Sequence, residues 1–259
     1  MKKLTIISSR SITINRFLLE VSSFLSKKFI VVLCCKDPIN INKINNFEKE
    51  YIAFPDSGRD LLNFKNNFKM IRQISNILKN SDLIYLHTPL ASHLVRLVNL
   101  FHFKKVKIIY HIHGLRYIPG SWSFREIFYR FIEFFLSFKT DKFIAINKLD
   151  YLSLLKFIPK TKISFIKGVG VKLPLVFKIR ELPSPNNLFV VGVIAAYKKS
   201  KGYEELIKIA KKCQNNQKII FKTFGYGDNQ WLRNLIKKNS IKNIEVNSYS
   251  QNIENEIEN

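Results

Sequence analysis

The chain of 259 residues carries 43 Lys and Arg against 19 Asp and Glu, a net charge of +24, and its hydrophobic content of 46% excludes a disordered protein. Cys34, Cys35 and Cys213 form no framework of paired cysteines, which indicates reduced thiols and a cytosolic protein. We expect no membrane-spanning helix, because no uncharged apolar run reaches about 18 residues, and the N-terminal apolar run is too short for a signal peptide.

Short β-branched runs alternate with longer amphipathic segments along the first 170 residues. Apolar strands separated by helices are typical of a parallel sheet covered on both faces, so we expect a doubly wound α/β domain. The predicted strands are Leu4–Ser8, Phe29–Cys34, Leu83–Leu86, Val106–His111, Phe143–Ile146 and Ile163–Lys167. The predicted helices are Asn15–Lys27, Leu61–Lys79, Leu90–Leu100, Phe124–Phe138 and Lys148–Phe157.

A stretch with three prolines and no clear period, residues 172–187, predicts a linker. The alternation then restarts, with strands at Leu188–Ile194, Ile219–Phe224 and Ile244–Val246 and helices at Lys201–Cys213 and Asp228–Asn239. We therefore expect two Rossmann-like domains, residues 1–171 and residues 188–259. Because such a domain normally has about 150 residues, we expect the second one to be incomplete.

The positive charge is unevenly distributed along the chain. Residues 1–180 have 31 basic and 11 acidic side chains, a net charge of +20, whereas residues 181–259 have 12 and 8, a net charge of +4. This asymmetry predicts that the N-terminal part faces an anionic partner, for which nucleic acid and a phospholipid surface are both admissible. The alternative is a solvated, lysine-rich surface without a partner.

The segment IIYHIHG, residues 108–114, places two histidines at the end of a predicted strand. His111 and His113 share one face of the strand, because they are two residues apart. They could be packed core side chains, metal ligands, or the rim of a binding cleft at the carboxyl ends of the strands. Zinc needs a third ligand, and no cysteine or further histidine has a convincing spacing, so we expect no metal. His87, just after another strand, is a further candidate for the cleft.

A basic loop, GVIAAYKKSKGY at residues 192–203, joins a predicted strand to a predicted helix. An anion there would relieve the repulsion between the lysines and the positive end of the helix dipole, so the loop predicts a diphosphate site. It contains no Walker motif, and a lysine-rich turn without a ligand is the alternative. Gly225 and Gly227, after the next strand, allow close approach of the backbone to a nucleotide or form an ordinary turn.

Six segments occur in an order that resembles glycosyltransferase family 4, the retaining enzymes with two facing Rossmann domains. They are SDLIYLHTPLAS, YHIHGLRY, KTDKFIAINKLD, IKGVGV, VVGVIAAYKKSKGYEEL and KTFGYGD, and they span nearly the whole chain. The resemblance is greatest to the bacterial enzymes that assemble capsule, O-antigen and other lipid-carrier-linked glycans. The uridine-diphosphate-sugar 2-epimerases share this architecture and are an alternative.

On the donor side, the resemblance implies a GT-B fold in which Lys201, next to Gly202, contacts the diphosphate of a nucleotide-sugar. Gly225 and Gly227 would lie near the nucleotide. Many relatives have an arginine where this chain has Ala196, so Lys198 or Lys199 would have to supply that charge. The paired glutamates that hold the donor sugar in the family would lie beyond residue 259, which implies that this chain alone is inactive.

On the acceptor side, the resemblance implies that His113 lines the reaction centre and that His111 supports it. The first loop of the family usually contains glycines, whereas ISSRSITIN has none, so serine side chains such as Ser9 would take their place. The further residues implied at the cleft are His87, Gly114, Gly168 and Gly170.

The resemblance therefore predicts a metal-independent enzyme without a cofactor that moves a sugar from a nucleotide-diphosphate donor to a polyprenyl-diphosphate-linked glycan. The aromatic and basic helix in SFREIFYRFIEFFLSFK predicts docking on anionic lipid at the inner face of the cytoplasmic membrane. The alternative for this helix is that most of its phenylalanines face the core. The alternative for the whole chain is a basic nucleic-acid- or membrane-binding protein without enzymatic activity.

Overall fold

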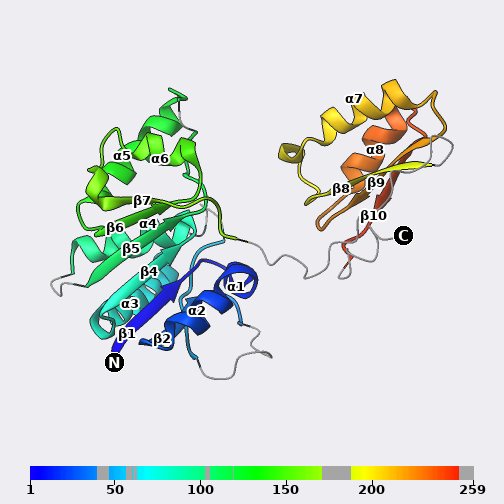
Figure 1. Ribbon diagram of the computed structural model, residues 1–259. Coiled ribbons are helices and arrows are strands. Elements are labelled where there is room, and N and C mark those ends of the chain that lie inside the picture. Colours follow the sequence, from blue (N-terminus) through cyan, green and yellow to red (C-terminus); the bar gives the residue numbers. More distant parts are fainter. Residues whose placement is uncertain are drawn as a thin grey trace. The chain divides into compact units, whose positions relative to one another are not determined.

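The computed structural model describes residues 1–39, 47–56, 60, 63–102, 106–118, 120–170 and 188–250. The chain divides into two compact units, Met1–Leu173 and Pro174–Asn259, here called unit 1 and unit 2 (Figure 1). The linker expected at residues 172–187 lies outside the described residues. Within the described ranges, no helix is both long enough and apolar enough to cross a membrane.

Unit 1 contains a seven-stranded sheet in the order β3-β2-β1-β4-β5-β6-β7. Every neighbouring pair is parallel, so the carboxyl ends of all the strands lie along one edge of the sheet. The direction in which strands are added reverses between β1 and β4, which is where ligands bind in open α/β sheets. The strands are β1 (Lys2–Ile7), β2 (Phe29–Cys35), β3 (Glu48–Tyr51), β4 (Leu83–His87), β5 (Lys107–Ile112), β6 (Lys142–Ala145) and β7 (Ile163–Phe165).

Helices cover both faces of this sheet (Figure 1). One apolar cluster joins the sheet to α3 (Phe64–Asn80), α4 (Pro89–Leu100) and α6 (Lys148–Leu154). A second cluster joins β1 and β2 to a helical segment made of α1 (Ser11–Thr13), a π-helical turn (Ile14–Leu18) and α2 (Leu19–Leu25). Because strand side chains alternate between faces, Ile6 belongs to the second cluster and Ile7 to the first.

The strands and helices predicted for unit 1 are confirmed to within a few residues, with two exceptions. The first helical segment begins at Ser11 rather than at Asn15, because Ile14 and Leu18 are both part of the core. The strand β3 is absent from the prediction, since its sequence, Glu-Lys-Glu-Tyr, has no apolar run. It is an edge strand, and Lys3 of β1 lies 3.2 Å from Glu48. Charged edge strands of this kind resist pairing with another chain.

The alternative in which most phenylalanines of the helix α5 (Phe124–Ser137) face the core is wrong. The buried side chains of α5 include Glu126 and Glu133, whereas its phenylalanine side chains are exposed. The reason is an ion pair: both carboxylate oxygens of Glu133 accept hydrogen bonds of 3.0 Å from Nη2 of Arg96 on α4. The exposed apolar residues in and just after α5 are Phe124, Ile127, Phe128, Phe131, Phe134, Phe135 and Phe138, here called the α5 aromatic face.

Unit 2 has a three-stranded parallel sheet in the order β10-β9-β8. Its elements are β8 (Phe189–Ile194), a 3₁₀ turn (Lys199–Lys201), α7 (Tyr203–Cys213), β9 (Ile219–Phe224), α8 (Gln230–Lys238) and β10 (Ile244–Asn247). Tyr203, Leu206 and Leu232 pack the two helices against Phe221 of the central strand. The β/α alternation predicted for this part of the chain is confirmed.

Candidate functional site

Ser9 and Thr88 meet where the strand order of unit 1 reverses. The N–H of Ser9, which follows β1, donates a hydrogen bond of 3.0 Å to Oγ1 of Thr88, which follows β4. Thr88 has a φ of 66°, a value that β-branched residues rarely adopt, and it precedes Pro89 at the start of α4. Strained backbone concentrates at functional sites, so this part of the carboxyl edge is a candidate site.

Three histidines lie beside this point, at the ends of β4 and β5. The strand register pairs His87 with His111, and His113 follows two residues later. The ring centroids are 5.1 Å apart for His87 and His111, 5.2 Å for His87 and His113, and 4.7 Å for His111 and His113. Nδ1 of His87 and Nε2 of His113 are hydrogen-bonded at 2.9 Å. We call these three residues the histidine cluster.

Burial keeps the histidine cluster uncharged at neutral pH. It lowers the pKa of His87 well below the ordinary value of 6.5, and the positive charges that His111 and His113 would carry lower it further. Burial, with a contribution from His113, lowers the pKa of His111 to about 4. Burial also lowers the pKa of His113. Each neutral ring has one N–H donor and one nitrogen lone pair.

The reason for expecting no metal was wrong, because the fold supplies the third histidine that the sequence spacing did not reveal. His87 lies 24 residues before His111 in the chain. The parallel pairing of β4 and β5 nevertheless brings one nitrogen of each of the three rings to within 4.8 Å of the others.

The three histidines differ in exposure. His87 is fully buried and His111 is 7% exposed, so neither offers a face to solvent. His113 is half-buried and is followed by Gly114 with a φ of 131°. Of the three rings, His113 is thus the most accessible to a ligand.

Gly168 and Gly170 lie after β7, at the same edge of the sheet, and both are exposed. The Gly168 N–H donates a hydrogen bond of 3.2 Å to the carbonyl of Ile146, which follows β6. Among the described residues, no atom lies within 4 Å of the place where a Cβ would be at either glycine. These two glycines therefore shape a turn and leave open space beside it.

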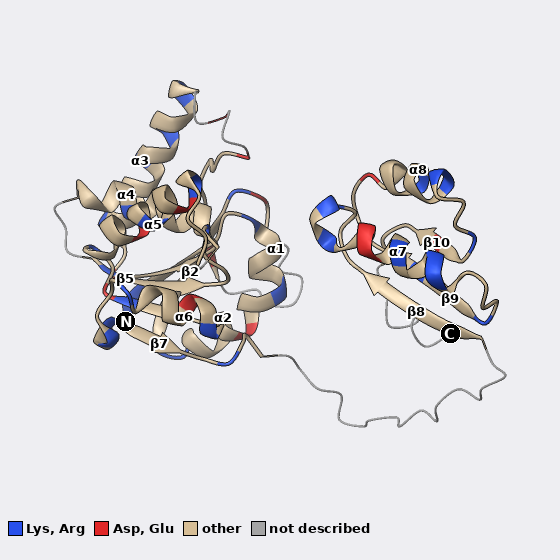
Figure 2. Ribbon diagram, turned by 90° about the horizontal axis from the view of Figure 1, so that it is seen from above, with Lys and Arg blue, Asp and Glu red and all other residues tan. Residues whose placement is uncertain are grey.

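In unit 2, Lys198, Lys199 and Lys201 lie in or beside the turn that precedes α7, and all three are exposed. Gly202, directly before the helix, has a φ of 75° and no side chain to cap the first N–H groups. These N–H groups and the lysines can bind an anion. Two acidic residues in the first turn of α7, Glu204 and Glu205, offset part of the lysine charge. Figure 2 shows basic and acidic residues next to each other at this end of α7.

Gly225 and Gly227 follow β9, and contacts and backbone conformation within unit 2 explain why both are glycines. A Cβ at Gly225 would lie 1.9 Å from the carbonyl oxygen of Ala195, so only glycine fits beside the end of β8. Gly227 has a φ of 105°, which favours glycine for conformational reasons. The close approach at Gly225 is therefore to the neighbouring strand, and this packing alone explains the residue.

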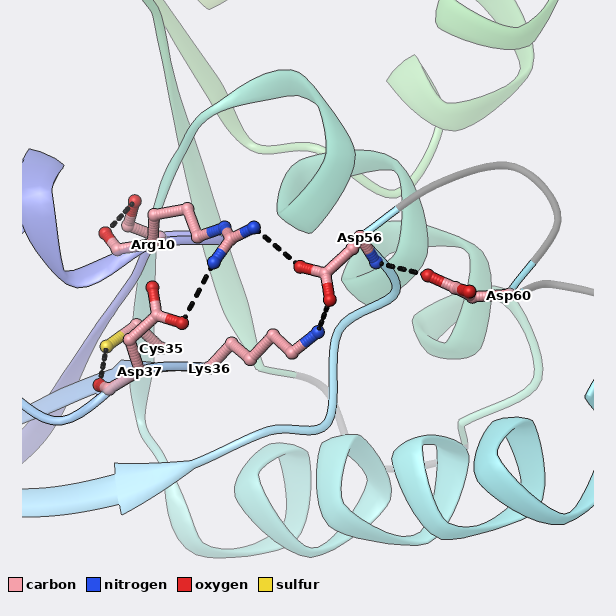
Figure 3. Close-up of polar contacts among 7 residues, drawn as sticks. Arg10, Cys35, Lys36, Asp37, Asp56 and Asp60 are labelled. Carbon is pink, nitrogen blue, oxygen red and sulfur yellow. Dashed lines mark hydrogen bonds and ion pairs between the residues drawn. The ribbon is translucent and has the colours of Figure 1, made fainter. Parts of the chain in front are cut away.

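A charged network that the sequence did not reveal lies at the ends of β1 and β2 (Figure 3). Arg10 contacts Asp37 at 3.0 Å and Asp56 at 2.6 Å, and Lys36 is also hydrogen-bonded to Asp56. The Lys36 hydrogen bond lowers the pKa of Asp56, and the charges of Lys36 and Arg10 add to this effect. A cavity of about 280 Å³ beside the network is lined by Lys36, Asp56, Phe54, Asp60 and Lys69. These residues are too far apart in the sequence to form a motif.

No protein-family model matches the chain. An uncharacterised 41.2 kDa protein in the cps region of Klebsiella pneumoniae is 27% identical over 168 residues. The match covers 61% of this chain and 46% of that protein, so the chain corresponds to less than half of this relative.

Solved structures share the fold at low identity. HepE from Anabaena, in complex with UDP and glucose, is 14% identical and has a TM-score of 0.69 over 98% of this chain and 71% of its own. The lipopolysaccharide outer core galactosyltransferase WaaB is 13% identical, with a TM-score of 0.66 over 100% and 71%. UDP-GlcNAc 2-epimerase from Neisseria meningitidis, bound to UDP-GlcNAc, is 15% identical, with a TM-score of 0.59 over 98% and 74%.

These likenesses confirm the predicted fold class. The chain has an α/β architecture of two Rossmann-like units, as in GT-B proteins. At 13–15% identity, they establish the fold and leave the activity to be argued from the residues.

Proposed function

We propose that the chain is part of a glycosyltransferase that uses a nucleotide-diphosphate sugar. The observation that supports this most is the likeness to HepE with UDP and glucose bound, which extends over 98% of the chain and so includes both units. In each unit, the residues implied by the resemblance lie after the carboxyl ends of parallel strands, the usual place for ligands in such sheets.

On the donor side, Lys201 would stabilise the negative charge that develops on the diphosphate leaving group, together with the uncapped N–H groups at the start of α7. Lys198 and Lys199 would add to the positive potential. None of these lysines has the planar fork of an arginine, so they would act as point charges. Because Glu204 and Glu205 are close by, a bound diphosphate would be held by a modest net positive charge.

On the acceptor side, His113 would contact the reacting sugar. It is half-buried and its pKa is lowered by burial, so the ring is neutral and can exchange hydrogen bonds with hydroxyl groups. His111 and His87, beneath it, hold the ring in position. Ser9, Gly168 and Gly170 would form the rest of the acceptor side at the same edge of the sheet.

The acceptor would be a polyprenyl-diphosphate-linked glycan, made for a surface polysaccharide at the inner face of the cytoplasmic membrane. The cps-region relative supports the surface-polysaccharide role. The α5 aromatic face supports membrane docking, because Phe124 is 87% exposed and Phe131 is 57% exposed. Arg125 and Lys139, both exposed, are basic residues in or next to this helix that would contact anionic headgroups.

Donor binding is tested by calorimetric titration of the full chain with UDP, UDP-glucose and UDP-GlcNAc, followed by an assay of sugar transfer to a polyprenyl-diphosphate acceptor. We expect one nucleotide to bind per chain. The substitution Lys201→Ala should weaken this binding, whereas Lys208→Ala, at an exposed position within α7, should not. Binding of RNA or DNA that depends strongly on salt, without affinity for any nucleotide-sugar, would favour the non-enzymatic alternative.

A sugar 2-epimerase is the second candidate function, favoured by the likeness to the Neisseria meningitidis enzyme with UDP-GlcNAc bound. An epimerase converts its nucleotide-sugar without an acceptor, whereas a transferase needs an acceptor to move the sugar. Incubation with UDP-GlcNAc alone, followed by NMR of the sugar, separates the two. Appearance of the 2-epimer would identify the epimerase.

Membrane docking is tested by flotation with vesicles that do or do not contain phosphatidylglycerol. We expect binding only to the anionic vesicles, with loss at high salt. The double variant Phe128→Asp/Phe131→Asp should abolish it, and both residues are exposed enough for the fold to tolerate the change. The control is Ile209→Asp on α7, which is similarly exposed. Equal binding to both kinds of vesicle would contradict an electrostatic contribution.

A further inference from the structure

The histidine cluster has the composition and spacing of a metal site. Two of the imidazole rings belong to the adjacent strands β4 and β5, the third follows β5, and one nitrogen of each lies within 4.8 Å of the others. The strand pairing fixes this arrangement, since His87 is directly opposite His111 and His113 follows on the same face. Two of the three rings therefore stand on paired strands of the sheet, and the third lies directly after β5.

Two nitrogens in the cluster are buried without a hydrogen-bond partner among the residues described. They are Nε2 of His87 and Nε2 of His111. Buried polar atoms are normally satisfied, and leaving one unpaired costs about 1–3 kcal/mol, so two adjacent ones call for an explanation. A cation bound to both lone pairs would remove this cost.

The remaining nitrogen of His111 has the partner that a metal ligand requires. The Tyr85 hydroxyl lies 2.7 Å from Nδ1 of His111. If Nδ1–H donates to the hydroxyl oxygen, the lone pair of the ring is on Nε2, the atom that has no other partner. Metal-bound histidines usually donate their second N–H to such a neighbour, which fixes the tautomer and the orientation of the ring.

We infer that His87, His111 and His113 form a binding site for a divalent transition-metal ion such as Zn²⁺. Three nitrogen ligands suit Zn²⁺, Co²⁺, Ni²⁺ or Cu²⁺, whereas Mg²⁺ and Ca²⁺ prefer oxygen. Tetrahedral zinc holds its nitrogens roughly 3.3 Å apart, given bonds of about 2.0–2.1 Å, so the rings must rotate to close the site. With Nε2 of His87 and Nε2 of His111 as two of the ligands, Nε2 of His113 becomes the third by leaving its hydrogen bond to Nδ1 of His87. Water or another oxygen ligand would complete the fourth position.

This inference goes beyond the proposed transferase function and does not depend on it. The family resemblance predicts a metal-independent transferase, and a metal would occupy a nitrogen of His113. A loaded site would therefore compete with the role proposed for that ring in unit 1. Nucleotide binding by the lysines of unit 2 is a separate property, so the two proposals can fail independently.

The test is a titration of tag-free, full-length chain, first stripped with EDTA, with Co²⁺ as a spectroscopic probe and with Zn²⁺ by calorimetry. We expect one ion per chain, visible d–d bands of tetrahedral Co²⁺ with nitrogen ligands, and a Zn²⁺ dissociation constant below about 1 µM. The substitution His113→Ala should weaken binding by about 100-fold or more. The matched control, His102→Ala at the end of α4, should leave it unchanged.

A second variant guards against a loss of binding that comes only from misfolding. Replacing the fully buried His87 would not serve, because it would disturb the core of unit 1. Tyr85→Phe keeps all three rings and removes only the hydroxyl beside His111, so Zn²⁺ affinity should fall about tenfold. Circular dichroism confirms that each variant is folded. The inference is overturned if Co²⁺ gives no d–d bands, or if folded His113→Ala binds Zn²⁺ as tightly as the parent chain.

Discussion

The two units place their ionisable groups differently. Unit 1 buries Arg96 and Glu133 as an ion pair and buries His87 and His111 in the histidine cluster. Over residues 188–250, unit 2 buries no charged side chain. Its candidate site consists of exposed lysines beside exposed glutamates, and all five histidines of the chain belong to unit 1.

This difference predicts how each site responds to change. Buried charges are weakly screened and depend on single partners, so unit 1 should be sensitive to substitution and to protonation. Exposed charges are screened by salt and share their effect among neighbours, so unit 2 should tolerate substitution of a single lysine and respond to ionic strength.

The largest expected effect is in unit 1. Glu133→Ala leaves the guanidinium of Arg96 buried without its carboxylate, and we expect the free energy of unfolding to fall by about 3–5 kcal/mol. Hydrogen exchange followed by mass spectrometry measures this for each unit separately. Protection should fall in peptides from β4 and β5 and stay unchanged in those from β9.

The control for this substitution removes both charges. In Arg96→Met/Glu133→Leu, no unpaired charge remains, so most of the lost stability should return. If Glu133→Ala were as stable as this double variant, the ion pair would not be what holds α5 on α4. The contrast drawn between the two units would then not hold.

A backbone contact gives the largest expected effect in unit 2. Gly225→Ala forces a methyl group against the Ala195 carbonyl, and we expect a loss of about 2–3 kcal/mol. Gly192→Ala, in β8, is the matched control, because among the described residues no atom lies within 4 Å of its Cβ position. Urea unfolding followed by the fluorescence of Trp231, which packs in the core of unit 2, measures both. Equal losses would contradict the packing explanation for Gly225.

The sequence predicted the strands that end at the candidate sites, because their apolar runs are local signals. It also predicted that His111 and His113 share a face, since this depends only on the two-residue period of a strand. The partnership with His87 could not be predicted, because it depends on the register between β4 and β5. Register is set by long-range packing that a single sequence does not display.

The orientation of α5 was missed for a similar reason. The helical period shows that phenylalanines and glutamates lie on different faces, but not which face is buried. Hydrophobicity alone favours burying the phenylalanines. The observed orientation depends on Arg96, which lies 37 residues before Glu133 and on another helix. The charged network around Arg10 escaped prediction in the same way.

Acid should destabilise unit 1 by a smaller amount. Burial alone would raise the pKa of Glu133, but Arg96 and His93 on α4 hold it below the ordinary value of 4.5. The unfolded chain therefore binds more protons below pH 4.5, so this contribution is present above that pH and is lost as the pH falls. Each unit of pKa difference corresponds to about 1.4 kcal/mol.

Urea unfolding of the parent chain from about pH 6 to about pH 3 measures this dependence, with hydrogen exchange to assign it to unit 1. Tyr110 of β5 also faces Glu133, and burial raises its pKa, so it stays neutral throughout. In Glu133→Gln, the acid-dependent loss should become smaller. An unchanged loss in this variant would show that other carboxylates cause it.

The smallest expected effect is at the exposed lysines of unit 2. Lys201→Ala should weaken UDP binding only three- to tenfold, about 1 kcal/mol, because Lys198 and Lys199 remain and Glu204 and Glu205 already offset part of the charge. Calorimetry at low and high salt checks this. Added salt should weaken binding by the parent chain more than by the variant, since the parent has one more charge to screen. Lys208→Ala, within α7, should behave like the parent. If Lys201→Ala lost about 100-fold in UDP affinity and salt did not change this loss, Lys201 would act from a desolvated site. Unit 2 would then not differ from unit 1 in using exposed charges.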